Sequence, residues 1–477
     1  MKPQLIGGAW VTSPTATPNI NPSDTREVIA EFGQADAAQA CAAIAAAAEA
    51  FPAWSRGSIQ RRGEILDAVG SELIARAPEL GRLLAREEGK TLAEGVGETI
   101  RAGQIFKFFA GETLRLTGDA LRSVRPGVEV SVTREPLGVV GLITPWNFPI
   151  AIPAWKAAAA LAYGNTVVLK PAELTPACAW ELADIIQRAG APAGVFNLVM
   201  GPGSVVGAAL VEDPRVAAIS FTGSTATGAR IGQACMARNA RVQLEMGGKN
   251  PLVVLDDADL DLAVECAVNG AFYSTGQRCT ASSRLIVTEG VHDRFAAAVA
   301  ERLHKLVVGH ALEDGVHVGP VVDRRQLETD LDYIDIGRKE GARLLAGGEL
   351  VTRETPGHFL SPALFVDVDN SMRIAREEIF GPVAAVIRVR DFDEALAVAN
   401  DTPYGLSAGI CTASLKHATA FRQEARAGMV MVNLPTAGVD PHVPFGGQKA
   451  SSYGPREQGR YAAEFYTTVK TAYTFAG

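Results

Sequence analysis

The sequence predicts an α/β protein with two parallel sheets that are covered by helices on both faces. Short apolar runs alternate with helical segments from Gly138 onward, and a second alternating series begins near Pro251. Continuous apolar strands separated by helices are typical of parallel sheets that are buried on both sides. The length of 477 residues is in keeping with two or three domains of roughly 150 residues each.

The first third of the chain has the pattern of helices. Asp36 stands where it can cap an alanine-rich helix that runs to Phe51, and further helical stretches are expected at residues 58–87 and 91–112. Residues 128–133 then alternate between valine and polar side chains, which predicts a half-exposed strand in a protruding hairpin.

The strands of the two series are marked by their apolar runs. The first series is GVVGLI, TVVLK, VFNLV and VAAISF, and the second is PLVV, SRLIVT, VAAVIRV, LSAGI and GMVMVN. We expect the two α/β units to join near Gly247 and Gly248.

Composition excludes several classes of function. The net charge is −8 and no block of Lys and Arg stands out, so nucleic acid is not an expected partner. The amino terminus lacks a secretory signal and no run of 18 apolar residues occurs, so we expect a cytoplasmic protein without a membrane segment. Six cysteines without a CxxC pair fit a reducing compartment, and without an HExxH or HxH cluster we expect no metal.

Two segments at strand ends are suited to the phosphates and hydroxyls of a nucleotide. VAAISF is followed by Gly223 and Ser224 and then a helix, whose first N–H groups form either an anion site or a plain turn capped by Ser224. Lys170 ends TVVLK and Glu173 follows, as either a ribose-binding pair or a solvated ion pair. Residues 201–207 resemble the dinucleotide fingerprint but have one residue too many.

Three further segments carry groups suited to covalent chemistry. Asn147 lies on a loop with prolines on both sides and is either an oxyanion donor or a turn residue. Glu245 precedes two glycines and is either a desolvated base or a surface acid. Cys279 follows Arg278, a cation that we expect to lower the pKa of the cysteine thiol. The nearest histidine in sequence is His292, so local Cys–His pairing is not supported.

The segments WNFP, KPAE, FTGST, EMGGKNP, GQRC, EEIFGP and PFGG follow one another in this order. Together they resemble the aldehyde dehydrogenase superfamily, and the resemblance extends from GGAW near the start to YTTVKTAYT near the end. EMGG departs from the ELGG of many members, a near-isosteric change. The resemblance implies a Rossmann-type cofactor domain (1–116 and 137–247), a catalytic α/β domain (248–447) and a β oligomerisation arm (117–136 and 461–477), and therefore a homodimer or homotetramer.

The resemblance also implies roles for individual residues. Cys279 would be the nucleophile, Glu245 the general base and Asn147 an oxyanion donor. The reaction would oxidise an aldehyde to a carboxylic acid through a thiohemiacetal and a thioester on the cysteine. The residues implied in binding NAD, with NADP possible, are Ile143, Pro145, Trp146, Lys170, Glu173, Gly203, Gly223, Ser224, Glu378 and Phe380.

The carboxyl-terminal segment resembles bacterial enzymes that oxidise 2-oxoglutarate semialdehyde, with succinate semialdehyde or another small aliphatic aldehyde as the alternative. A substrate carboxylate requires a cation, and Arg278 or His442 is expected to supply it. Trp155 stands where some semialdehyde enzymes have an arginine. The expected substrate contacts are Phe148, Trp155, Arg278, Thr280, His442 and Phe445.

Three rival functions remain. A CoA-acylating enzyme of the same fold would not need Glu245, and an inactive relative would not need Cys279 and Glu245 together. A cysteine hydrolase would need neither FTGST nor KPAE.

Overall fold

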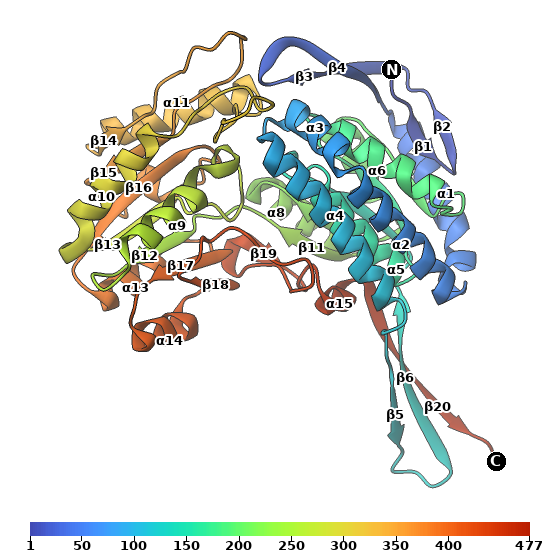
Figure 1. Cartoon of the computed structure of the whole chain (residues 1–477). Coiled ribbons are helices and arrows are strands. Elements are labelled where there is room, and N and C mark those ends of the chain that lie inside the picture. The colour runs from blue at the N-terminus through green and yellow to red at the C-terminus, as the bar shows by residue number, and fades with distance from the viewer.

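The computed structural model of the chain describes residues 1–477 and has two lobes with a thin arm projecting from one of them (Figure 1). Each lobe is built around its own sheet, so the predicted α/β class with two series of strands is confirmed. The amino terminus lies on the lobe that carries the arm, and the carboxyl terminus lies at the tip of the arm.

The first lobe contains an eight-stranded sheet in the order β19-β11-β10-β7-β8-β9-β1-β2. Five neighbouring strands, from β11 to β9 in this order, are parallel, and four of them are the apolar runs of the first series. The strands are β1 (Gln4–Ile6), β2 (Ala9–Val11), β7 (Val139–Ile143), β8 (Thr166–Lys170), β9 (Phe196–Leu198), β10 (Val216–Thr222), β11 (Arg241–Glu245) and β19 (Ser452–Tyr453).

Helices cover both faces of this sheet. Asp36 caps the first of them, as predicted, by accepting a 2.8 Å hydrogen bond from the N–H of Gln39. The stretch expected at 58–87 is two helices, because the chain breaks at Arg76. The helices are α1 (Ala37–Ser55), α2 (Ile59–Ala75), α3 (Ala77–Glu88), α4 (Leu92–Glu112), α5 (Ala151–Ala162), α6 (Pro176–Arg188), α7 (Ala208–Glu212) and α8 (Thr225–Ala237).

The helical pattern expected for the first third missed four strands that precede α1. Besides β1 and β2, a hairpin of β3 (Thr15–Asn21) and β4 (Asp24–Gln34) arches towards the second lobe (Figure 1). Its turn joins that lobe through backbone hydrogen bonds from Thr25 to Pro356 and from His358 to Pro22.

The second lobe contains a seven-stranded sheet in the order β14-β15-β16-β13-β12-β17-β18. Five strands are the predicted second series, and β14 and β15 were not predicted. The strands are β12 (Pro251–Val254), β13 (Arg284–Thr288), β14 (Arg343–Ala346), β15 (Ala363–Val366), β16 (Val383–Val389), β17 (Ser407–Cys411) and β18 (Met429–Val432). The helices are α9 (Leu260–Phe272), α10 (Glu289–His304), α11 (Arg324–Lys339), α12 (Arg373–Arg376), α13 (Phe392–Asn400) and α14 (Leu415–Glu424).

The arm is a three-stranded sheet made from two distant parts of the chain. The predicted strand is present as β6 (Val128–Pro136), and it lies between β5 (Asp119–Arg122) and β20 (Thr467–Phe475). A short helix α15 (Ala463–Tyr466) leads into β20, which pairs with β6 over its full length. No helix of the structure is both long enough and apolar enough to span a membrane.

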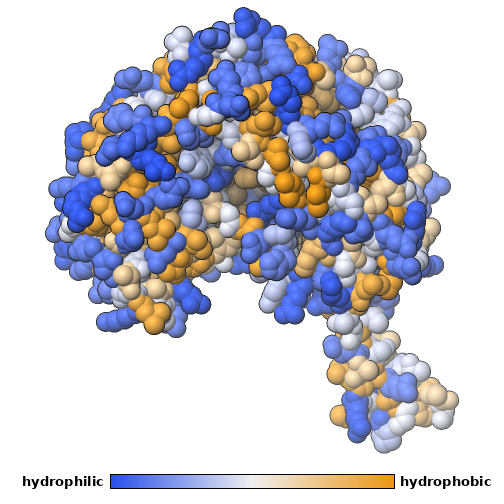
Figure 2. Space-filling view, viewed as in Figure 1, coloured by the Kyte–Doolittle hydropathy of each residue, from blue (hydrophilic) through white to orange (hydrophobic).

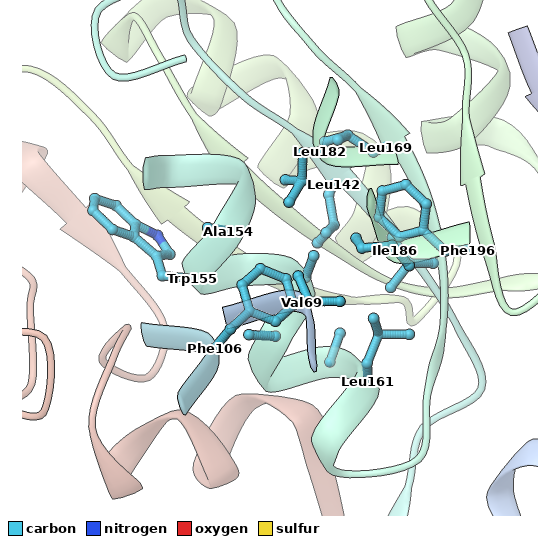
Figure 3. Close-up of a cluster of buried hydrophobic side chains, with 14 of the residues drawn as sticks. Val69, Phe106, Leu142, Ala154, Trp155, Leu161, Leu169, Leu182, Ile186 and Phe196 are labelled. Carbon is cyan, nitrogen blue, oxygen red and sulfur yellow. The ribbon is translucent and has the colours of Figure 1, made fainter. Parts of the chain in front are cut away.

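Helix α5 connects the core to the space between the lobes. All its residues are buried, and it packs on α2, α4 and the first sheet, where its alanines permit close approach. Figure 3 shows the cluster formed by Phe106, Leu142 and their neighbours, with Trp155 at one edge and its ring directed away from the others. Because α5 is held firmly, it fixes the position of the WNFP loop that directly precedes it.

Candidate active site

Two cavities meet at Cys279, in the region where the space-filling view shows a recess between the lobes (Figure 2). The larger, which we call the α4 cavity, has a volume of about 370 Å³; the smaller, the α8 cavity, has about 230 Å³. Cys279 is the one residue that lines both. A group bound in either cavity therefore has access to the same sulfur atom.

The loop that presents Cys279 is strained and held from α4. After α9 the chain makes a tight turn in which Ser274 and Thr275 have φ of +51° and +57°, values that are costly for residues with side chains. Glu94 of α4 offsets this cost, because its Oε1 accepts hydrogen bonds from the N–H of Ser274 (2.7 Å) and from its hydroxyl (2.9 Å). The loop that carries Cys279 thus depends on a carboxylate about 180 residues earlier.

The expected lowering of the Cys279 pKa was wrong. Desolvation, followed by the negative charges of Glu378 and Glu245, raises the pKa of this thiol to about 12, while the N–H groups of Cys279 and Thr280 lower it less. The guanidinium of Arg278 does not offset this effect, because it is directed to the carbonyl of Asn269. The sulfur is therefore a thiol at neutral pH and must lose its proton before it can attack.

Asn147 is buried in the wall of the α8 cavity. Its Nδ2 donates a 3.0 Å hydrogen bond to the carbonyl of Gln277, two residues before the cysteine. Lys90 donates to the carbonyl of Asn147, and its Nζ lies 2.9 Å from Glu98 Oε2. Glu98 in turn accepts from the first N–H groups of α5. The buried ion pair of Lys90 and Glu98 therefore holds the WNFP loop at two points, the carbonyl of Asn147 and the start of α5.

Glu245 lies behind the α8 cavity and lines neither cavity. Its carboxylate is only 2% exposed and accepts a 2.6 Å hydrogen bond from the Ser452 hydroxyl. Burial and the neighbouring Glu457 raise the pKa of Glu245 well above its ordinary value, against the opposing effects of Ser452 and Lys156. Lys156 and Glu457 themselves form a buried ion pair. The expectation of a desolvated rather than a surface acid fits this environment.

The α8 cavity holds most of the predicted cofactor residues. The rings of Trp146 and Phe380 meet edge to face with centroids 5.3 Å apart. Glu378 Oε1 accepts a 2.8 Å hydrogen bond from the N–H of Gly248, and a Cβ on Gly247 would lie 2.1 Å from Glu378 Oε2. The remaining lining residues are Pro145, Asn147, Thr222, Gly223, Ser224, Met246 and Gln326.

A second group of predicted residues gathers at the carboxyl end of β8, outside the α8 cavity lining. Lys170 Nζ lies 3.6 Å from Glu173 Oε1, and the same oxygen accepts a 3.1 Å hydrogen bond from the N–H of Gly203. Ser224, which does line the α8 cavity, also caps α8 by accepting a hydrogen bond from the N–H of Thr227. Ile143 ends β7 in the hydrophobic core and lines neither cavity.

Five of the six predicted substrate contacts line the α4 cavity: Phe148, Trp155, Arg278, Thr280 and Phe445. The rings of Trp155 and Phe445 have centroids 5.6 Å apart. His442 is the exception, because its side chain is exposed and lines neither cavity. Helix α4 also lines this cavity, with Glu94, Gly97, Glu98 and Arg101, and its contribution was not predicted from the sequence. No group of three His, Cys, Asp or Glu side chains is placed to hold a metal ion.

The chain is similar to known enzymes over its whole length. A model described as the aldehyde dehydrogenase family matches residues 10–472. The chain is 45% identical to the alpha-ketoglutaric semialdehyde dehydrogenase of Bacillus subtilis, over 98% of this chain and 97% of that protein. It is 46% identical to the alpha-ketoglutarate semialdehyde dehydrogenase of Haloferax volcanii, over 98% of both.

A solved structure extends this similarity to the fold. The crystal structure of betaine aldehyde dehydrogenase from Staphylococcus aureus in complex with NAD+ has a TM-score of 0.97 at 34% identity, and the match covers 100% of this chain and 95% of that one. The resemblance drawn from the motifs is thus confirmed, and the chain belongs to the aldehyde dehydrogenase family, whose members use NAD(P) to oxidise aldehydes.

Proposed function

We propose that this enzyme oxidises 2-oxoglutarate semialdehyde to 2-oxoglutarate with NAD as its preferred cofactor, through a covalent intermediate on Cys279. The observation that carries the proposal is the position of Cys279 on the wall shared by two cavities. The names of the relatives from Bacillus subtilis and Haloferax volcanii support the choice of substrate.

The residues around the α8 cavity fit a dinucleotide. Glu173, which accepts from the N–H of Gly203, would bind the hydroxyls of one ribose, and Glu378 offers carboxylate oxygens for a second ribose. The hydroxyl of Thr222 is buried in the lining without a partner, as expected beside a phosphate oxygen. When bound, the nicotinamide ring supplies a hydride acceptor. The negative charge of Glu173 opposes a 2′-phosphate, which is why we favour NAD over NADP.

Cys279 would first lose its proton to solvent, and its thiolate would then form a bond to the aldehyde carbon while the carbonyl π bond breaks and the carbonyl oxygen becomes an oxyanion. Asn147 is suited to stabilise it, because its Nδ2 carries two hydrogens and only one is engaged by Gln277. The N–H of Cys279 is the second candidate donor. Loss of a hydride from the same carbon leaves a thioester on the sulfur.

Glu245 would remove a proton from the water that hydrolyses this thioester, releasing the acid and the Cys279 thiol. To do so its carboxylate must leave Ser452 and turn towards the cavity. Gly446 packs directly against it, because a Cβ there would lie only 2.8 Å from Glu245 Oε1 and would crowd the carboxylate. The raised pKa makes Glu245 a stronger base once it is ionised.

The charges of the α4 cavity favour an anionic substrate. Arg101 and Arg278 both line it without a carboxylate partner, which opposes a cation such as betaine aldehyde. The test is reduced-nicotinamide absorbance with 2-oxoglutarate semialdehyde, succinate semialdehyde, pentanal and betaine aldehyde, using NAD and NADP, with and without CoA. A preference for betaine aldehyde or a requirement for CoA would overturn the proposal.

We also propose that the arm joins copies of the chain, as a homodimer or homotetramer, and that the first lobe is the cofactor domain and the second the catalytic domain. The exposed apolar side chains of β20, Val469, Tyr473 and Phe475, support self-association. Light scattering on the full chain and on a Tyr473→Lys variant tests the arm: an unchanged oligomer would contradict it.

A further inference from the structure

One face of α4 is turned towards the α4 cavity. Glu94, Gly97, Glu98 and Arg101 all line it, and their spacing of three and four residues is that of one helix face. A Cβ on Gly97 would meet nothing within 4 Å, so the wall is open at this position. Arg101 stands one turn beyond that opening.

Most charges in the lining are matched within the protein. Lys90 pairs with Glu98 at 2.9 Å and lies 3.8 Å from Glu88, while Glu94 is engaged by Ser274. Arg101 is different: its only hydrogen bond is a long one of 3.5 Å to the side-chain carbonyl of Gln458, and it forms no ion pair, although the charges of Glu98 and Asp440 act on it from a distance.

Arg278 repeats this pattern, because its guanidinium meets only the Asn269 carbonyl and no carboxylate. Three N–H groups of lining residues also lack any acceptor: Nε of Arg101, Nε of Arg278 and Nε1 of Trp155. Buried donors are nearly always satisfied, and leaving one unpaired is costly. Unmatched positive charge and unpaired donors in one cavity indicate a ligand rich in anionic oxygen.

We infer that Arg101 and Arg278 form the subsite that binds the 2-oxo carboxylate end of the substrate, with the indole N–H of Trp155 as a neutral donor. The inference rests on the proposed function and names the residues that select its substrate. A guanidinium offers a planar fork of donors that matches a carboxylate. Phe148 and Phe445, which line the same cavity, are suited to the methylene groups between the two ends of the substrate.

The test compares kcat/KM for 2-oxoglutarate semialdehyde with that for pentanal, an uncharged aldehyde of equal chain length. Wild type should prefer the semialdehyde. Arg101→Met should reduce this preference by about 10–100-fold, through KM for the charged substrate, because a charge-assisted hydrogen bond is lost. Arg101→Lys should restore part of it, and His442→Ala, outside both cavities, should preserve it.

Binding supplies a second measurement, which does not depend on turnover. Calorimetric titration with 2-oxoglutarate should give weaker binding to Arg101→Met and to Arg101→Gln than to wild type, with thermal melting as the check on folding. If wild type prefers the semialdehyde and Arg101→Met keeps both the preference and the affinity, this inference falls while the proposed substrate stands. If wild type prefers pentanal, the proposed substrate falls as well.

Discussion

The hydroxyl of Ser452 donates a 2.6 Å hydrogen bond to Oε2 of Glu245, across two strands that are paired at these same residues. The segment that carries Ser452 returns from the second lobe to the edge of the first sheet. The environment of the proposed base is thus completed by a residue 207 positions later in the chain.

The first prediction is a pH dependence. Glu245 acts as a base only when ionised, and its pKa is raised, so the rate of thioester hydrolysis should increase as pH rises through that pKa. Ser452 stabilises the ionised form, so Ser452→Ala should raise the pKa further and move the profile to higher pH. Turnover measured from pH 5 to 10 checks this. A shift to lower pH would contradict the assignment, and Glu245→Gln, as the control, should lack the profile.

The second prediction concerns the oxyanion. Asn147→Ala removes a side-chain donor beside Cys279 and should slow the first reduction of cofactor by on the order of 10²–10³. Stopped-flow absorbance under single-turnover conditions measures that step directly. Cofactor binding followed by fluorescence titration serves as the control, because Asn147 also lines the α8 cavity. An unchanged single-turnover rate would make Asn147 a turn residue.

The third prediction concerns cofactor choice. Glu173→Gln keeps an acceptor for the N–H of Gly203 but removes the charge that opposes a 2′-phosphate. We expect the ratio of kcat/KM for NAD to that for NADP to fall by about 10-fold, since Lys170 then faces the phosphate without a competing carboxylate. A wild-type enzyme that prefers NADP, or a ratio unaffected by the substitution, would contradict this.

The fourth prediction concerns stability. Asp330 of α11 is fully buried, has one hydrogen bond, from Gln326, and burial raises its pKa to about 8 from 3.8. The folded state therefore holds a proton that the unfolded state loses, so wild-type stability should fall as pH rises between about 4 and 8.

Asn at position 330 has no proton to lose in this pH range, so Asp330→Asn should not show this fall in stability. The melting temperature of the variant should therefore decline less than that of wild type over the same range. Thermal melts at pH 5, 7 and 9 check the difference, with Asp332→Asn, at an exposed position, as the matched control. Parallel decline in wild type and Asp330→Asn would refute the account.

The sequence predicted the parallel strands well, because buried strands are unbroken apolar runs that local pattern reveals. It failed at β3, whose residues are largely exposed and lack such a run, and at β14, which is only four residues long. The residues around Cys279 were predicted through the ordered series of segments that includes WNFP, GQRC and PFGG, because the resemblance of the whole series, and no single segment, implied their roles.

The α4 side of the site was missed for a physical reason. Glu94, Glu98 and Arg101 sit in an ordinary helix, and nothing local distinguishes a charge facing a cavity from one facing water. The available signal was Gly97, which lies on the same helix face as these three residues. Glycine weakens a helix, so a glycine on this face indicates that open space is needed there. The raised pKa of Cys279 was missed because it depends first on burial and then on the charges of Glu378 and Glu245, all of which only the fold determines.

The central claim is that Cys279 carries the acyl intermediate, and trapping that intermediate tests it most directly. Glu245→Gln should still transfer hydride but hydrolyse the thioester on the order of 10²–10⁴ more slowly. After mixing this variant with NAD and 2-oxoglutarate semialdehyde, mass spectrometry should find one acyl group per chain, on the peptide that contains Cys279, and none in Cys279→Ala. An acyl group on another cysteine, or aldehyde oxidation by Cys279→Ala, would contradict the account.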